Sequence, residues 1–321
     1  MKRIPVTLFV MLAGILWLGC AAAQSYPTKP VRTLYPFPAG GGGELALRAL
    51  TAELGKRTSH PFLVENRPGG NTMIAADLCA KASADGYTIC MVPIDAISIN
   101  PFIFKKLPYD PENDLEPVAS VFSNVQAFFV NPALKVGSLK EFIELAKSKP
   151  GALNYGSPAA FVMLYFEGFN STVGIDVKHI PYKGGGDVIT ALLAGDIQVA
   201  FVALSNVVGL LKSGKIKVLA VEGSKRSPLA PDVPTLSEAG FQGMPFRAWY
   251  GVFAPRGTPK SIISQLHGHI AAVLETPAFR EELIGRGLDP MPGTTEQFAQ
   301  YLREDRVRAQ KLVKQAGLQA E

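Results

Sequence analysis

The chain has 321 residues, of which 47% are hydrophobic and 18% are charged. This composition supports a large buried core and excludes an intrinsically disordered chain, and the length suits one large domain or two of ordinary size. The formal net charge is +5, and removal of Lys2 and Arg3 with a signal peptide leaves +3. So small a charge, without any run of basic residues, argues against a nucleic-acid partner.

The first 23 residues have the features of a secretory signal peptide. A positively charged start is followed by an apolar stretch over residues 6–19 and by small residues at 21–23. The apolar stretch is shorter than the roughly 20 residues that span a bilayer, so we expect cleavage after Ala23 rather than a membrane anchor. A lipid-anchored form through Cys20 is the alternative, although Trp17 stands where lipoprotein signals usually have an aliphatic residue. No later segment has the length and apolarity of a span, so we expect an exported, soluble protein.

From residue 31 to residue 92 the chain alternates between strand and helix patterns. Residues 31–37 are typical of a strand, and residues 44–57 place Leu and Ala at the spacing of an amphipathic helix. A strand at 62–66, a helix at 72–82 and a strand at 87–92 follow, separated by glycine-containing turns. This alternation predicts an α/β fold with a parallel or mixed sheet covered by helices.

Two cysteines, Cys79 and Cys90, remain after the signal peptide is removed. They flank an expected helix end, an Asp-Gly turn and a strand start, which could bring their Cα atoms within the ~7 Å that a disulfide needs. Because export permits such a bridge, a disulfide and two buried thiols are both open readings. Neither reading makes the cysteines catalytic, since no histidine lies near them in the sequence.

A second α/β set begins near residue 125. Ser138 starts its first helix, and Glu141 three residues later completes a capping box. Further strand and helix patterns lead to a Pro-rich connection at 227–236, a strand at 248–255 and the helices that end the chain. These last helices have no strands of their own, so we expect them to pack on the first set.

The expected fold is therefore a two-domain α/β protein with a discontinuous first domain and a ligand cleft between the domains. Residues 24–127 plus 252–321 would form the first domain, and residues 128–251 the second. Hinges should lie at the two crossings, near 125–130 and 247–251. Ligands bind preferentially in such clefts and at the C-terminal ends of strands.

Two glycine loops, Gly40–Gly43 and Gly184–Gly186, each lie between a strand and a helix and are each followed by an acid. Backbone N–H groups at such a helix start can bind an anion. The first loop lacks the Lys-Ser/Thr ending of a phosphate loop and the dinucleotide spacing. A plain turn with Glu44 at the helix start and a carboxylate site are therefore both favoured over a nucleotide site. In different domains, the two loops could face one another across the cleft.

Signals for catalysis are weak. Ser157 follows Gly156 at a strand end, where it could cap a helix or contact a ligand, but no Gly-x-Ser-x-Gly nucleophile elbow surrounds it. His267 and His269 are two residues apart on a helix and face different sides, so we expect no metal site, and no cofactor motif occurs. Asp95 could hydrogen-bond a ligand hydroxyl or cap the segment that follows it.

Several motifs occur in a recognisable order after the signal peptide: YPTKPVRTLYPFPAGGGGELALRAL, VENRPGGN, DGYTI, YKGGGDVITALLAGDIQVAF and AWYGVFAPRGTP. Together they strongly resemble the periplasmic solute-binding proteins of tripartite tricarboxylate transporters, also called Bug proteins. The resemblance covers essentially the whole mature chain. It implies a type II-like flytrap fold, a periplasmic location and a carboxylate ligand. It also implies membrane permease subunits as partners, a monomer and no catalysis.

The resemblance further implies which residues hold the ligand, mostly through backbone N–H groups and small hydroxyls on facing loops. With Asp95 added, the implied ligand-binding set is Phe37, Pro38, Ala39, Gly40, Gly41 and Gly42 in the first loop, Gly156, Ser157, Pro158 and Ala159 in the facing loop, and Tyr182, Lys183, Gly184 and Gly185 beside the pocket.

The sequence departs from the family pattern in three places. Glu44 stands where Asp is usual, apolar residues follow Ser157, and Val202 stands where many members have an acid. Loss of that acid disfavours an amino-acid ligand. Phe161 and Met163 would form an apolar wall if they face the cleft, which favours a carboxylate with an apolar or aromatic body over citrate; the alternative is that both pack inside the second domain. An exported hydrolase and a ligand sensor that feeds a signalling partner are the rival functions.

Overall fold

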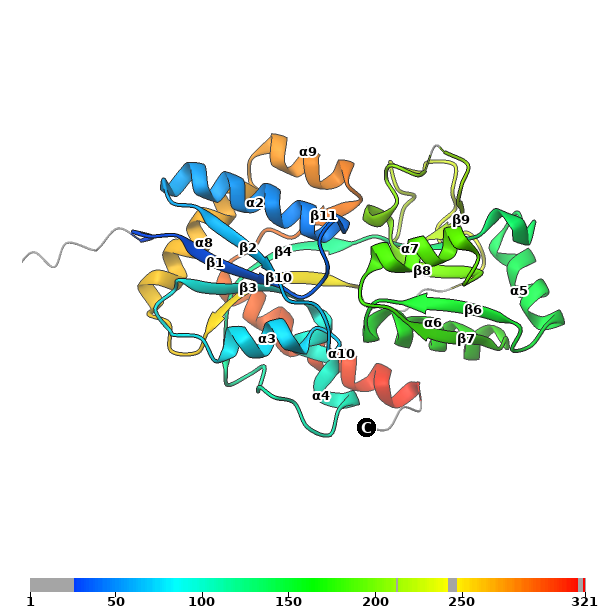
Figure 1. Cartoon of the computed structure of the whole chain (residues 1–321), viewed down its shortest axis with the longest axis horizontal. Helices are drawn as coiled ribbons and strands as arrows, with labels where there is room; N and C mark the ends of the chain where they lie inside the picture. The colour runs from blue at the N-terminus through cyan, green and yellow to red at the C-terminus, as the bar shows by residue number, and fades with distance from the viewer. Residues whose placement is uncertain (1–25, 212, 242–246, 317–319, 321) are drawn as a thin grey trace, which may run out of the picture.

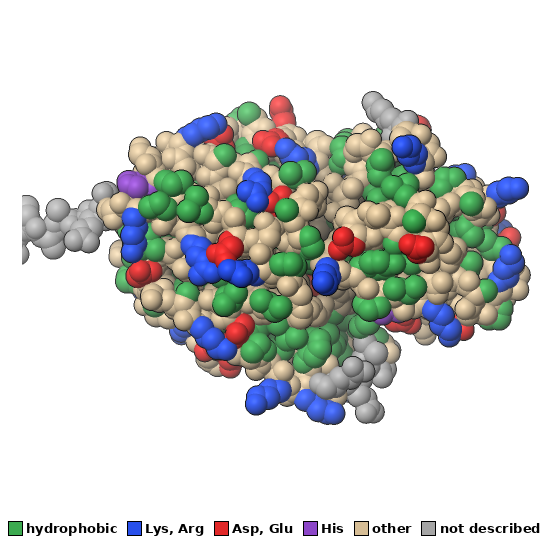
Figure 2. Space-filling model, viewed as in Figure 1, with side chains coloured by type: hydrophobic (Ala, Val, Ile, Leu, Met, Phe, Trp, Pro, Cys, Tyr) green, Lys and Arg blue, Asp and Glu red, His purple; other side chains and the backbone are tan. Residues whose placement is uncertain are grey.

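The computed structural model describes residues 26–211, 213–241, 247–316 and 320, and Figure 1 shows two lobes lying side by side. Each lobe contains one β-sheet with helices on both faces, which confirms the predicted α/β fold. The predicted signal peptide, its cleavage after Ala23 and the alternative at Cys20 lie outside the described residues. Within them, no helix has the length and apolarity to cross a membrane. On the face in Figure 2, basic side chains are spread among acidic ones.

The first lobe is built on a sheet with the strand order β11-β4-β10-β3-β1-β2. Strands β1 to β4 run parallel to one another, and β10 and β11 run antiparallel to them. The strand bounds are β1 Val31–Tyr35, β2 Phe62–Asn66, β3 Thr88–Pro93, β4 Leu115–Asn124, β10 Trp249–Pro255 and β11 Leu288–Pro290.

Helices cover both faces of this sheet because its strands alternate their side chains between two apolar cores. On β3, Ile89 and Met91 face one core, and Cys90 and Val92 face the other. The first core is covered by α2 (Gly42–Thr58), α8 (Lys260–Leu274) and α9 (Pro277–Gly285), and the second by α3 (Met73–Ala80), the π-helical turn η1 (Asp95–Ile99), α4 (Asn100–Ile103) and α10 (Thr295–Gln315).

A disulfide joins Cys79 in α3 to Cys90 in β3, with the two Cα atoms 6.0 Å apart. Both residues are fully buried. The bridge therefore links a helix on one face of the sheet to an inner strand. Of the two alternatives left open by the sequence, a disulfide and two buried thiols, the structure has the disulfide.

The second lobe repeats this plan on a sheet with the order β7-β6-β8-β5-β9. Phe128 and Phe201 face a core with α5 and α6, whereas Ala127 and Val202 face a core with α7. The bounds are β5 Gln126–Val130, η2 Pro132–Leu134, α5 Leu139–Ser148, β6 Leu153–Ser157, α6 Ala160–Val173, β7 Val177–Pro181, α7 Gly185–Ala194, β8 Val199–Ala203, η3 Leu204–Asn206 and β9 Lys217–Val221.

The chain passes between the lobes twice. β4 ends at Asn124 and β5 begins at Gln126, so only Val125 separates a strand of the first sheet from a strand of the second. On the return, β10 enters the first sheet at Trp249. The strand that follows each crossing is antiparallel to both of the strands beside it. In the first sheet this strand is β10, between β3 and β4, and in the second sheet it is β5, between β8 and β9. This shared order is the predicted two-domain, type II-like arrangement with a discontinuous first lobe.

The C-terminal region differs from expectation in one element. Strand β11 lies between α9 and α10 and pairs with β4 at the edge of the first sheet, where the sequence predicts helices alone. Three residues are too few to give an alternating pattern, so the sequence carries no signal for this strand. The change of sheet at Val125 lies just before the predicted boundary at 127/128, and the domain boundaries themselves stay a prediction.

Candidate functional site

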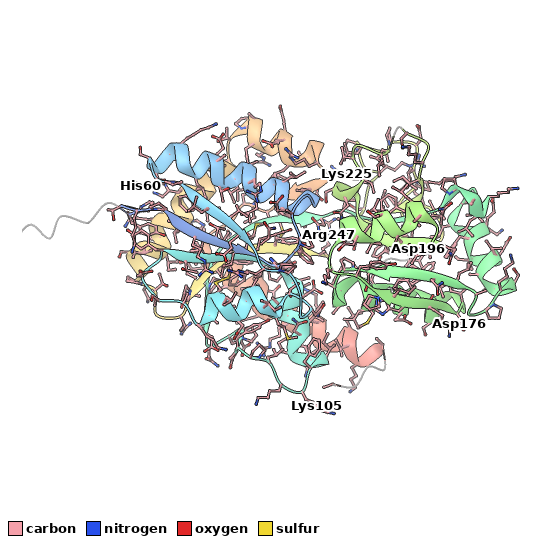
Figure 3. All side chains as sticks on the ribbon, in the orientation of Figure 1. His60, Lys105, Asp176, Asp196, Lys225 and Arg247 are labelled. Carbon is pink, nitrogen blue, oxygen red and sulfur yellow. A yellow bond between two sulfur atoms is a disulfide. The ribbon has the colours of Figure 1, made fainter. Side chains whose placement is uncertain are left out.

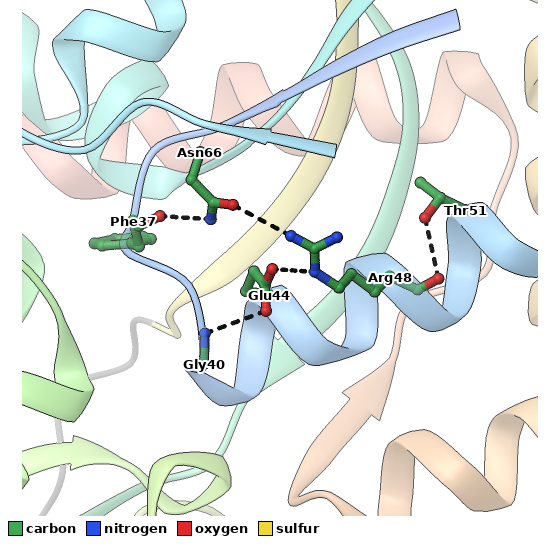
Figure 4. A network of polar contacts seen from close by, with 6 residues as sticks. All are labelled: Phe37, Gly40, Glu44, Arg48, Thr51 and Asn66. Atoms are coloured by element: carbon green, nitrogen blue, oxygen red, sulfur yellow. Dashed lines mark hydrogen bonds and ion pairs between the residues drawn. The ribbon is translucent and has the colours of Figure 1, made fainter. Parts of the chain in front are cut away.

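A polar network at the start of α2 shapes the first glycine loop (Figure 4). Glu44 is 1% exposed, accepts a hydrogen bond from the Gly40 N–H at 3.3 Å and pairs with Arg48 one turn later. Asn66, at the end of β2, accepts from Arg48 at 3.4 Å and donates to the Phe37 carbonyl at 2.8 Å. Glu44 thus holds the loop and complements the helix dipole, so it is not available as a free acid.

The second glycine loop meets the first at the boundary between the lobes. α7 begins at Gly185, and a Cβ on the preceding Gly184 would lie 2.9 Å from Cδ of Pro38 in the first lobe. Gly42 is more crowded still, because a Cβ there would lie 2.4 Å from Cβ of Ser205 in the second lobe. Glycine is required at both positions by the close approach of the lobes, and the two loops face one another as expected.

A cavity of about 280 Å³, which we call cavity 1, lies between the lobes where these loops meet. The N-terminal ends of α2 and α7 both border it, and such helix ends carry partial positive charge. Asn206 stands between them: its Oδ1 accepts from the Gly42 N–H at 3.5 Å, and its Nδ2 donates to the Ala203 carbonyl at 3.2 Å. The cavity is therefore bordered by backbone donors from both lobes and by the side-chain amide of Asn206 from the second lobe.

Asn71 and Asp95 of the first lobe cap helix α6 of the second. The Phe161 N–H donates to Asp95 Oδ1 at 2.6 Å, and the Ala160 N–H donates to Asn71 Oδ1 at 2.9 Å. The N-cap of α6 is Ala159, which has no side-chain acceptor, so the first donors of this helix are satisfied from across the cleft. Asp95 is 3% exposed, and burial raises its pKa to about 6 against the effect of the Phe161 hydrogen bond.

A second cavity, cavity 2, has a volume of about 440 Å³ and is also lined from both lobes. Ser157 Oγ and His179 Nε2 lie 2.6 Å apart at its wall. Burial lowers the pKa of His179, while the nearby carboxylate of Glu167 raises it less, so the ring is neutral at pH 7. Cavities 1 and 2 share the lining residues Phe37, Pro158 and Ala159.

The predicted ligand-binding residues divide between these two cavities. Gly42 and Gly156 line neither, since Gly42 packs against Ser205 and Gly156 packs inside the second lobe. Cavity 1 is lined by Phe37, Pro38, Ala39, Gly40, Gly41, Asp95, Pro158, Ala159, Gly184 and Gly185, and cavity 2 by Phe37, Ser157, Pro158, Ala159, Tyr182 and Lys183.

Sequence reasoning missed several polar residues of cavity 1: Asn124, Gln126, Thr190, Ser205 and Asn206. Ser205 and Asn206 directly follow β8, and the C-terminal ends of strands are where α/β sheets bind ligands, so this signal was present in the sequence. Phe161 borders cavity 1 but is 2% exposed and packs in the core, which is the alternative stated for it, whereas the partly buried Met163 lines cavity 2.

A buried acid lies beside the crossing between the lobes. Glu222, just after β9, is 7% exposed and lies beside the backbone of Gln126. Burial raises its pKa to about 8, and the charge of Arg247 and the Gln126 N–H oppose this shift, so the group is mostly protonated at neutral pH. Arg247 is 3.6 Å from Asp289, and Figure 3 places it where the lobes meet. In the described part of the chain, no cluster of three or more His, Cys, Asp or Glu could hold a metal ion.

Comparison with known proteins agrees with this architecture. A family model described as the tripartite tricarboxylate transporter family receptor matches residues 46–318. Protein BugT of Bordetella pertussis is 31% identical over 315 residues, which cover 97% of this chain and 96% of BugT. A protein encoded in the gbd 5′ region of Cupriavidus necator is 30% identical over 322 residues, with 97% of each chain covered.

Solved structures of similar proteins share the two-lobed fold. Rpa4515 of R. palustris, determined with adipate, has a TM-score of 0.89 and 30% identity, covering 92% of this chain and 100% of that one. MatC of Rhodopseudomonas palustris, with bound malate, has a TM-score of 0.84 and 29% identity over 90% of this chain and 100% of that one. The periplasmic binding protein BugD has a TM-score of 0.87 and 27% identity over 92% and 100%. The chain therefore belongs to the TctC, or Bug, family of periplasmic solute-binding proteins.

Proposed function

We propose that this protein captures an organic carboxylate in the periplasm and presents it to the membrane permease subunits of a tripartite tricarboxylate-type uptake system. Membership of the family supports this function, and two similar structures hold the dicarboxylates adipate and malate. In this chain, the observation that carries the proposal is the pair of glycine-rich helix starts, α2 and α7, which border cavity 1 from opposite lobes.

Cavity 1 has the chemistry that a carboxylate needs. Backbone N–H groups at two helix N-termini stabilise an anion by hydrogen bonds and by the helix dipoles, and Gly41 and Gly185 lie at those ends beside Asn206. Hydrogen bonds to a charged group contribute about 1.5–3 kcal/mol each. Three or four such bonds leave an affinity in the micromolar range after the costs of association.

Binding proceeds by closure of two domains around the ligand. We propose the two domains expected from the sequence, residues 24–127 plus 252–321 and residues 128–251, with their limits moved to the hinges at Val125, where the chain changes sheet, and at Trp249, where β10 enters the first sheet. The caps that Asn71 and Asp95 place on α6 hold the closed form. The protein acts as a monomer, without cofactor or catalysis.

The test is a thermal-shift screen of the purified mature protein, followed by calorimetry. The ligands are mono-, di- and tricarboxylates, aromatic acids, amino acids and neutral sugars. A carboxylate should raise the melting temperature and remain chemically unchanged. Stabilisation by an amine or a sugar alone, or turnover of the carboxylate, would contradict the proposal.

A pair of glycine variants tests the assignment to cavity 1. Gly185→Ala places a Cβ 2.5 Å from Asn206 Nδ2 and should remove the shift, whereas Gly268→Ala, on α8 and outside both cavities, meets nothing within 4 Å and should keep it. Both substitutions add one methyl group to a helix. An equal effect of the two variants would place the ligand elsewhere.

A second candidate function is an exported hydrolase, which the contact between Ser157 and His179 favours. A neutral imidazole can act as a general base for a serine hydroxyl. However, the N–H groups of Ala160 and Phe161, which would stabilise an oxyanion beside Ser157, are engaged by Asn71 and Asp95. Hydrolysis of aryl esters that disappears in Ser157→Ala would establish this activity, and stable esters would exclude it.

A further inference from the structure

We propose that cavity 2 receives the apolar body of the ligand whose carboxylate lies in cavity 1. The preferred ligand is then an amphiphilic carboxylate with an alkyl or aryl chain. This inference rests on the proposed function, because it assumes that the carboxylate is bound at the two glycine loops.

The wall of cavity 2 is largely apolar. Ile103 and Phe104 contribute from the first lobe, and Met163 and Tyr182 from the second. Three of the polar side chains on this wall have protein partners. Ser157 contacts His179 at 2.6 Å, and the Asn71 side chain is bonded to Asn100 at 2.6 Å as well as to α6. A hydrocarbon placed here therefore leaves these three groups paired, and its removal from water is favourable.

The two cavities adjoin each other and leave room for a chain. Phe37 from the first lobe and Pro158 and Ala159 from the second line both. An apolar cavity of about 150 Å³ is enough to bind benzene, and cavity 2 has about 440 Å³. A ring or a chain of several methylenes therefore fits in it while the attached carboxylate stays in cavity 1.

Cavity 2 is formed jointly by the two lobes, so an apolar occupant adds its burial energy only when the lobes are closed. Chain length of the ligand should therefore appear directly in its affinity.

The experiment is calorimetric titration of the mature protein with unbranched monocarboxylates from acetate to octanoate, with phenylacetate and with 1-octanol. Affinity should rise about fourfold for each added methylene, equivalent to ~0.8 kcal/mol per buried CH₂. Met163→Trp, which fills cavity 2, should remove this gain and leave the binding of acetate unchanged. Leu193→Trp, an exposed substitution on α7 that lines neither cavity, is the matched control and should keep the gain.

The outcomes separate this inference from the function on which it rests. Binding of carboxylates with no dependence on chain length would overturn the assignment of cavity 2 and leave carboxylate binding intact. Equal affinity for octanoate and 1-octanol would also overturn it, since the carboxylate in cavity 1 would then contribute nothing. Failure of every carboxylate to bind would overturn both proposals.

Discussion

Substitution of Gly42 by alanine should weaken ligand binding by holding the two lobes apart. A Cβ at this position would lie 2.4 Å from Cβ, 2.5 Å from Oγ and 2.6 Å from the backbone oxygen of Ser205, which belongs to the other lobe. Optimal carbon contacts are about 3.5–4.0 Å, so the lobes must separate by about 1 Å. Rotation of the serine side chain cannot relieve the contact, because one of the three atoms is a backbone oxygen.

The size of the effect follows from overpacking. An extra methyl group in a well-packed contact costs about 1–3 kcal/mol, and here the cost falls on the closed form, because each lobe can fold without the contact. Since the closed form is the one that buries the ligand, the dissociation constant should rise about 5- to 150-fold. The free energy of unfolding without ligand should change by less than about 1 kcal/mol, because alanine is favoured over glycine in a helix.

Calorimetry with a bound carboxylate measures the loss of affinity, and small-angle scattering measures separation of the lobes. Gly268→Ala is the matched control, because it adds the same methyl group on α8, outside both cavities, with nothing within 4 Å. If Gly42→Ala bound ligand as tightly as the unmodified protein and scattered identically, the lobes could not meet at Ser205 in solution, and the closed arrangement would be wrong.

Three further predictions concern the lobe junction and the core. The pKa of Glu222 is raised in the folded protein, so the stability linked to its protonated form is complete below pH 4.5 and is lost as pH rises toward 8. Urea titrations should show the unfolding free energy falling over this window by an amount on the order of 5 kcal/mol, and Glu222→Gln should flatten the slope. Reduction of the Cys79–Cys90 bridge should lower the unfolding free energy by about 2–4 kcal/mol, and an unchanged urea midpoint in reductant would contradict this. Asn71→Ala removes the cap on the Ala160 N–H and should weaken ligand binding about fivefold for a loss of ~1 kcal/mol; calorimetry showing full affinity would mean that the cap does not hold the closed form.

Much of the fold can be predicted from the sequence because its signals are local. The alternation of strand and helix patterns, the glycine turns and the capping box at Ser138 each occupy a few consecutive residues, and the structure has the corresponding elements. β11 is the exception, because a three-residue edge strand is defined by its partner β4 rather than by its own pattern.

The site is predicted less completely, because its geometry depends on contacts between distant segments. Asp95 shows the limit: local reasoning offers a ligand hydroxyl or the segment that follows it, yet its carboxylate accepts from Phe161, 66 residues further along the chain. The division into two cavities likewise cannot be predicted from the sequence. It depends on Phe37 of the first lobe and Pro158 of the second, which line both cavities where the lobes meet. Side-chain direction and lobe closure are not encoded in any short motif.

The discontinuous first lobe has a consequence for how the chain folds as it emerges from the export machinery. β10, at Trp249–Pro255, lies in the middle of the first sheet between β3 and β4, while every strand of the second sheet lies between Gln126 and Val221. Until β10 has been translocated, β3 and β4 lack the strand that pairs with both of them. The second lobe can therefore be complete while the sheet of the first lobe still lacks a central strand. Proteolysis of chains truncated after residue 240 should leave the second lobe protected and cleave the first, and equal cleavage of both would contradict this order. The lobe that begins the chain is then the last to finish folding.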